Sequence, residues 1–154
     1  MNNIKKITSF EVDHRTLNPG MYVSRRDGDI TTYDLRTRRP NADNYMDNET
    51  MHTVEHMFAT YIRNSDIANN VIYFGPMGCQ TGFYLLTRDI NDNKVYETVK
   101  TVLLQIIGHN GEVFGASEKE CGNYQTLVLE KAQAECENYL RVLNNIKNLN
   151  YAED

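Results

Sequence analysis

The segment from Met51 to His56 constrains this chain more than any other. It places two histidines four residues apart, and on a helix such residues lie on one face with Cβ atoms about 5–6 Å from each other. Two imidazoles at that separation can hold one metal ion. Glu55 follows His52 by three residues and borders the same face, where a carboxylate can transfer protons for groups that a metal activates. The segment therefore predicts a helix with a metal-binding face, and the alternative from these residues alone is a surface helix with two solvated histidines.

The rest of the chain predicts helices packed on a sheet. We expect a helix over residues 49–63 with Asp47 or Asn48 as its N-cap. Further helices are predicted over residues 93–107, which ends at Gly108, and 125–148. Strands are predicted over residues 21–24, 30–38, 70–74 and 82–87. Because strands and helices do not alternate strictly, residues 1–154 predict a single α+β domain with a largely antiparallel sheet.

Composition and charge exclude several function classes. The formal net charge is −5, and Arg36, Arg38 and Arg39 form no larger basic field, so we expect no nucleic-acid binding. The chain lacks the roughly 18–20 consecutive apolar residues of a membrane span, and its first residues do not resemble a secretory signal. We therefore predict a cytoplasmic protein. Its three cysteines are an odd number, which argues for free thiols rather than a disulfide framework.

The three cysteines occupy different settings. Cys79 lies among three glycines between two predicted strands, in a tight loop that can present a thiol to a ligand. Cys136 lies on the apolar face of the last predicted helix and is expected in the core. Cys121 lies in a polar loop before a helix, where a thiolate forms readily, and we predict it as the third metal ligand. Glu118 and Glu120 are the competing third ligands, and the other alternative for Cys121 is a structural cysteine without a metal.

Several segments together resemble one enzyme family, the S-ribosylhomocysteine lyase (LuxS) family. The resemblance covers nearly the whole chain and depends on segments in a fixed order: residues 9–14, Tyr33-Asp34-Leu35-Arg36, Arg39-Pro40-Asn41, residues 52–56, 75–79 and 81–84, and Cys121-Gly122-Asn123-Tyr124. Each segment alone is weakly specific, whereas their order on a chain of this size is highly specific.

The resemblance implies roles for individual residues. It implies His52, His56 and Cys121 as ligands of one divalent metal, which is Fe(II) in the family and can be replaced by Zn(II) or Co(II), with water as the fourth ligand. It implies Glu55 and Cys79 as the acid/base residues, and Ser9, His14 and Arg36 as residues that line the substrate pocket. It also implies a homodimer with active sites at the subunit interface. From the residues alone, His14 can equally be a paired surface group and Arg36 part of a cross-strand ion pair.

The implied reaction explains why these groups are needed. The family converts S-ribosylhomocysteine into homocysteine and 4,5-dihydroxy-2,3-pentanedione, the precursor of autoinducer-2. The thioether lies on C5 of the sugar, so the carbonyl must migrate from C1 to C3 before β-elimination can break the C5–S bond. Each step is a proton transfer next to a carbonyl, which a Lewis-acidic metal and two acid/base residues promote.

Two other functions explain part of the pattern. A metallopeptidase would use Glu55 to activate metal-bound water between His52 and His56, but it would leave Cys79 without a role. A non-enzymatic metal-binding module would use four protein ligands and leave no open coordination position.

Overall fold

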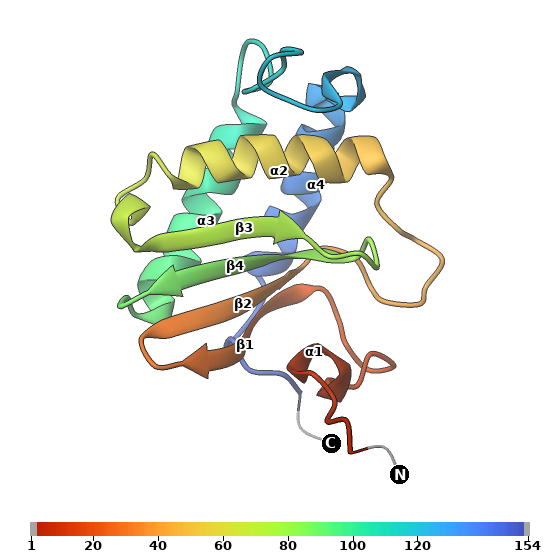
Figure 1. Ribbon diagram of the computed structural model, residues 1–154, viewed down its shortest axis with the longest axis vertical. Coiled ribbons are helices and arrows are strands. Elements are labelled where there is room, and N and C mark those ends of the chain that lie inside the picture. The colour runs from red at the N-terminus through yellow and green to blue at the C-terminus, as the bar shows by residue number, and fades with distance from the viewer. Residues whose placement is uncertain (1–2, 153–154) are drawn as a thin grey trace.

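A computed structural model describes residues 3–152, in which helices pack on a sheet (Figure 1). The strands are β1 (Gly20–Asp27), β2 (Ile30–Arg36), β3 (Val71–Pro76) and β4 (Gly82–Arg88). The helices are α1 (Thr8–Glu11), α2 (Asn48–Ile62), α3 (Asp92–Ile107) and α4 (Leu129–Leu143), with 3-10 turns η1 (Ala68–Asn70) and η2 (Tyr124–Thr126). Within this described range, none of the helices is long and apolar enough to cross a bilayer.

The strands of the described chain form one antiparallel sheet in the order β1-β2-β4-β3. Tyr33 lies opposite Leu85 and Leu35 lies opposite Phe83 in the β2–β4 ladder, and all four side chains are buried. Because side chains alternate between the two faces along a strand, these residues define one buried face. The arrangement confirms the predicted α+β fold with a largely antiparallel sheet.

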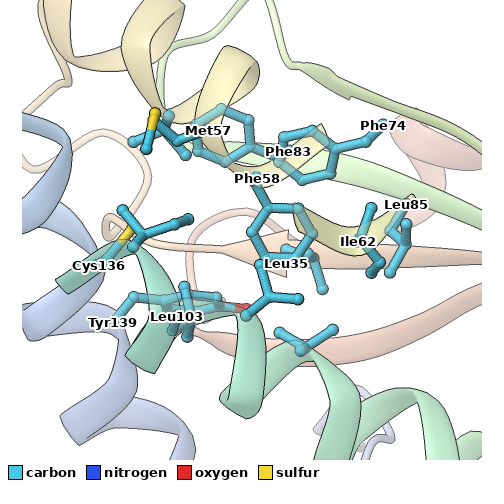
Figure 2. Close-up of a cluster of buried hydrophobic side chains, with 14 of the residues drawn as sticks. Leu35, Met57, Phe58, Ile62, Phe74, Phe83, Leu85, Leu103, Cys136 and Tyr139 are labelled. Atoms are coloured by element: carbon cyan, nitrogen blue, oxygen red, sulfur yellow. The ribbon is translucent and has the colours of Figure 1, made fainter. Parts of the chain in front are cut away.

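The core lies between this face and the helices α2, α3 and α4 (Figure 2). The rings of Phe58, Phe74 and Phe83 stack in series, with centroids 4.3 and 5.1 Å apart. Cys136 of α4 is only 1% exposed, and burial raises the pKa of its thiol. Cys136 therefore belongs to the core, as its place on an apolar helix face predicts.

The opposite face of the sheet is covered in part by the C-terminal segment. Tyr151 stacks on Tyr22 of β1, with ring centroids 4.7 Å apart. Its hydroxyl donates a hydrogen bond of 2.7 Å to Asp34 of β2, whose side chain points away from the helices because its neighbours Tyr33 and Leu35 point toward them. This face therefore buries a carboxylate, which becomes important for the site below.

The first two long helices match their predicted limits closely. Asp47 is the N-cap of α2, and its side chain accepts the backbone N–H of Thr50. Helix α3 begins at Asp92, one residue before the predicted start, with Asn91 as its N-cap. It ends at Ile107, and Gly108 is its C-cap. These caps supply partners for backbone groups that a helix terminus leaves without them, which explains why they mark the boundaries.

The predicted limits of the last helix are wrong. Helix α4 covers Leu129–Leu143 rather than residues 125–148. At its start, the hydroxyl of Thr53 in α2 accepts the backbone N–H of Val128, and the preceding residues form the separate turn η2. Tertiary contacts with α2 therefore replace the helical continuation that the apolar spacing favours.

Two strand limits also differ from those predicted. Strand β1 extends to Asp27, well past the predicted residue 24, and turns at Gly28, which has a φ of +62°. Strand β2 ends at Arg36 rather than residue 38, because the backbone N–H groups of Thr37 and Arg38 both donate to the carbonyl of Thr81. This bifurcated contact fixes the loop between β3 and β4 against the end of β2.

Candidate metal centre

Three side chains that the sequence singled out meet on one side of α2. The possible ligand atoms of His52, His56 and Cys121 all lie within 4.8 Å of one another. The sulfur of Cys121 lies 3.4 Å from Nε2 of His52, although the two residues are 69 positions apart in the chain. All three residues are half-buried. We refer to His52, His56 and Cys121 as the metal group.

The loop that carries Cys121 also orients His52. Nδ1 of His52 lies 2.6 Å from the hydroxyl of Thr126, and this hydroxyl donates to the carbonyl of Asn123 at 3.0 Å. Because the hydroxyl has one proton, it accepts from His52, which leaves Nε2 unprotonated and directed toward Cys121. The backbone N–H of Asn123 in turn lies 3.4 Å from the sulfur of Cys121. One short loop thus supplies a ligand and orients a second.

A second loop orients His56. Its Nδ1 donates to the carbonyl of Phe114 at 2.8 Å, which leaves Nε2 available to a metal. The next residue, Gly115, has a φ of +69°, and a Cβ there would lie only 3.1 Å from Nδ1 of His56. Glycine therefore permits both the backbone conformation and the close approach of this loop to the imidazole.

The metal group fits a divalent cation. Zinc–ligand distances of about 2.0–2.3 Å at tetrahedral angles place donor atoms roughly 3.4–3.6 Å apart, close to the observed sulfur–nitrogen distance. Burial lowers the pKa of His52 and so does the neighbouring His56, which favours the neutral imidazole that binds metals. Two imidazoles and one thiolate suit zinc or another late first-row ion. Among residues 3–152, the competing ligands Glu118 and Glu120 are not part of this group of possible ligands.

Glu55 lies beside the metal group on the same helix and is half-buried. Its charge opposes the lowering of the His52 pKa, which places the carboxylate within electrostatic range of that imidazole. A carboxylate in this position can accept or donate a proton near a metal-bound ligand.

Cys79 belongs to a second cluster, in the turn between β3 and β4. Its sulfur lies 3.0 Å from the hydroxyl of Thr81. Nη1 of Arg36 donates to the same hydroxyl at 2.8 Å and lies 3.8 Å from the sulfur. Arg36 is 3% exposed and also pairs with Asp34 through two hydrogen bonds of 3.1 and 2.7 Å. We refer to Cys79, Thr81, Arg36 and Asp34 as the thiol group.

This arrangement corrects one alternative for Arg36. The ion pair joins two residues of the same strand rather than two strands, because Asp34 and Arg36 are two positions apart and share a face. Burial works to lower the pKa of Arg36, but the hydrogen bonds and charge of Asp34 outweigh it and the pKa is raised. Arg36 is therefore a fixed cation whose remaining donors point toward Cys79 and Thr81.

Ser9 and His14 lie in the N-terminal segment, within and just after α1. Both are half-buried, and Nδ1 of His14 donates to the carbonyl of Val12 at 2.8 Å. In the described part of the chain, no hydrogen bond, ion pair or ring contact joins either residue to the metal group or the thiol group. The structure thus assembles the metal group, pairs Cys79 with Arg36, and shows no contact of these kinds from Ser9 or His14 of the described chain to either group.

The sequence analysis missed the residues that hold these groups in place. Thr126 and Phe114 orient the two imidazoles, and Thr81 bridges Arg36 and Cys79. Nothing in the sequence marks Thr126 or the carbonyl of Phe114, because both act through loop conformation. The contact of Asp34 with Arg36 could have been predicted, since a carboxylate two residues before an arginine on a strand faces the same side.

Comparison with known proteins gives a consistent result. The profile of a family described as S-ribosylhomocysteinase (LuxS) matches residues 7–149. An S-ribosylhomocysteine lyase of Borreliella burgdorferi is 44% identical over 96% of this chain and 99% of the relative. Enzymes of the same name from Finegoldia magna and Clostridium acetobutylicum are 45% and 42% identical, and each alignment covers 97% of this chain and all of the relative.

Proposed function

This chain belongs to the S-ribosylhomocysteine lyase (LuxS) family of carbon–sulfur lyases, and we propose that it cleaves S-ribosylhomocysteine with a divalent cation bound by His52, His56 and Cys121. The products are homocysteine and 4,5-dihydroxy-2,3-pentanedione. The observation that carries the proposal is the convergence of a loop cysteine on two helical histidines whose Nδ1 atoms are already engaged. The proposed cation is Fe(II), with Zn(II) or Co(II) as replacements.

The reaction requires proton transfers at several neighbouring carbons of the sugar. When bound, the cation would act as a Lewis acid on the carbonyl and hydroxyl oxygens of the substrate. Glu55, beside the metal group, would transfer hydroxyl protons and assist the final elimination that breaks the C5–S bond. Cys79 would remove and return protons at carbon during carbonyl migration. Two acid/base residues are needed because protons move at both carbon and oxygen.

The thiol group supports this role for Cys79. Arg36 has no acceptor, so it must donate to the hydroxyl of Thr81, and that hydroxyl keeps its own proton to donate to the sulfur when Cys79 is a thiolate. A thiolate at this position would find two donors already oriented, one of which carries a fixed positive charge. Arg36 thereby contributes to proton transfer in addition to any contact with substrate.

A homodimer with active sites at the interface would bring together two groups that are not joined within one chain. Within residues 3–152, no hydrogen bond or ion pair joins the metal group to the thiol group. The segment around Ser9 also exposes three apolar side chains, since Ile4, Ile7 and Phe10 are 80%, 58% and 67% exposed. Exposed apolar clusters of this kind are typical of protein interfaces. In the proposed dimer, the metal group of one copy faces the thiol group and N-terminal segment of the other.

Incubation of the purified protein with S-ribosylhomocysteine tests the activity. We expect release of one free thiol per substrate, loss of turnover after removal of the metal under nitrogen, and recovery when Fe(II) or Co(II) is added. A hundredfold excess of cation over its Kd should also stabilise the folded protein by about 2.7 kcal/mol. His52→Ala should abolish both the metal-dependent turnover and the stabilisation by the cation. Cleavage of a peptide library without thiol release would favour the metallopeptidase instead.

Mixed dimers test the shared active site. Glu55→Ala and Cys79→Ala should each retain metal and lose turnover. If the two residues act from different subunits, unfolding and refolding the two variants together restores one intact site in each mixed dimer. Turnover that stays absent in a sample shown to contain mixed dimers would place Glu55 and Cys79 of one site in the same subunit.

A further inference from the structure

The loop that orients His56 has few backbone interactions of its own. It contains three glycines, Gly108, Gly111 and Gly115, of which the last two have positive φ angles. Among the described residues, positions 110–116 form no helix or strand and only one turn, at Phe114 and Gly115. Yet the carbonyl of Phe114 in this loop must stay within 2.8 Å of Nδ1 of His56. Side chains must therefore hold the loop in place.

His109 is the residue that joins this loop to α2. The hydroxyl of Tyr61 in α2 lies 2.7 Å from Nδ1 of His109, and Nε2 of His109 lies 2.8 Å from the carbonyl of Glu112. Because a carbonyl only accepts, Nε2 carries the proton, and Nδ1 then accepts from the tyrosine hydroxyl. Both ring nitrogens are satisfied in one tautomer, which fixes the ring and the turn from His109 to Glu112.

Ring contacts extend this link to Phe114. The Phe114 ring meets the rings of His109 and Tyr61 edge-on, with centroids 4.9 and 5.1 Å apart. Such edge-to-face pairs contribute about 0.5–1.5 kcal/mol beyond the area they bury. Tyr61 lies five residues after His56 on α2, so the helix that carries the ligand also anchors the loop that orients it. The three rings and two hydrogen bonds form one connected unit beside the metal group.

We infer that His109 and Tyr61 are positioning residues for the ligand His56, acting through the carbonyl of Phe114. This inference depends on the proposed metal site but adds residues that the proposed reaction does not use. Without the Tyr61–His109 hydrogen bond, ring contacts remain the main link between the side chains of the loop and Tyr61, and the carbonyl of Phe114 fixes the orientation of the His56 imidazole less firmly. Mutation of a residue that hydrogen-bonds a metal-bound histidine commonly lowers metal affinity by about 10–100-fold.

Cobalt binding tests the inference directly. Metal-free wild type, Tyr61→Phe, His109→Phe and the double variant are titrated with Co²⁺ against a competing chelator. We expect Tyr61→Phe to weaken Co²⁺ binding about tenfold, the lower end for an indirect partner, and to shift the visible absorption bands of the bound Co²⁺. Since both residues act through one hydrogen bond, the double variant should bind no more weakly than the weaker single variant.

Tyr96→Phe is the matched control. It also removes the hydroxyl of a half-buried tyrosine that donates to a backbone carbonyl, that of Leu143, but it lies on α3 away from the ligands. We expect its Co²⁺ affinity to stay within about twofold of wild type, because distant sites act independently. Tyr61→Phe that unfolds like Tyr96→Phe and binds Co²⁺ like wild type would overturn the inference, as would equal weakening in both. Absence of Co²⁺ binding by wild type would instead overturn the metal site itself.

Discussion

The metal group and the thiol group are held in place by different interactions. The ligands of the metal group come from α2 and a loop, and each imidazole is oriented by one hydrogen bond to a loop atom. The thiol group is held by a buried ion pair between Asp34 and Arg36, whose side chains are 2% and 4% exposed. The metal group therefore depends on local loop structure and the thiol group on the integrity of the sheet.

The largest expected effect is on the thiol group. Asp34→Ala leaves the guanidinium of Arg36 buried without its partner, and removal of one member of a buried pair commonly costs about 3–5 kcal/mol. We expect a loss of this size in the free energy of unfolding, measured with urea. Cobalt affinity of the folded fraction should change little, because none of the interactions of Asp34 with residues 3–152 reaches the metal group.

Asp27→Ala provides the control for charge. It removes a carboxylate that also pairs with an arginine two residues away on a strand, but the side chains of Arg25 and Asp27 are 51% and 48% exposed. Exposed pairs add little to stability, so we expect only a small loss. Equal losses in Asp27→Ala and Asp34→Ala would show that burial of the ion pair is not what stabilises the thiol group.

The second prediction concerns the metal group. Thr126→Val keeps the shape of the side chain but removes the oxygen that accepts Nδ1–H of His52. We expect metal affinity to fall about 10–100-fold, while the stability of the metal-free protein changes little. Competition with a chelator measures the affinity. Thr98→Val on α3 makes the same chemical change at a hydroxyl that donates to the carbonyl of Lys94. An equal loss of affinity in Thr98→Val would contradict the local character of the metal group.

The same contrast explains what could be predicted from the sequence. His52 and His56 could be predicted because helical spacing alone places them together, and the cap Asp47 marks where that helix begins. The partner Thr126 could not, because its position depends on the turn η2, which the sequence analysis assigned to a helix. Local periodicity identifies ligands within one element but does not reveal loops that reach them from elsewhere.

The thiol group shows a different limit. The resemblance to the family directs attention to Cys79 and Arg36, but it does not show that a threonine hydroxyl lies between them. The end of β2 was also misplaced, because the carbonyl of Thr81 accepts the N–H groups of Thr37 and Arg38. Both features arise from packing of the β3–β4 turn against β2, a contact between residues more than 40 positions apart.

The smallest expected effect concerns Asp47, the N-cap of α2. Asp47 begins the helix of the metal group, where it accepts the N–H of Thr50 at 2.8 Å and pairs with Lys131 at 2.8 Å. The preceding residue, Met46, exchanges two hydrogen bonds of 3.0 Å with Gln80 in the turn of the thiol group. Asp47 therefore caps the helix of the metal group next to a residue that is hydrogen-bonded to the β3–β4 turn, and Asp47→Ala should cost about 1 kcal/mol of stability at neutral pH.

The pH dependence of stability separates the charge of Asp47 from its capping role. The Lys131 hydrogen bond, followed by the Thr50 N–H, lowers the Asp47 pKa from 3.8 to about 2. A carboxyl group whose pKa falls on folding stabilises the protein above its unfolded pKa, and this contribution is lost as the pH falls toward the folded value. We expect the stability difference between wild type and Asp47→Asn, which retains a capping oxygen, to be constant above about pH 5 and to shrink between about pH 4 and 2. The metal affinity of Asp47→Asn at neutral pH should fall less than that of Thr126→Val, because Asp47 lies more than one helical turn before His52. A stability difference that does not change with pH would show that the cap, and not the charge, accounts for the contribution of Asp47.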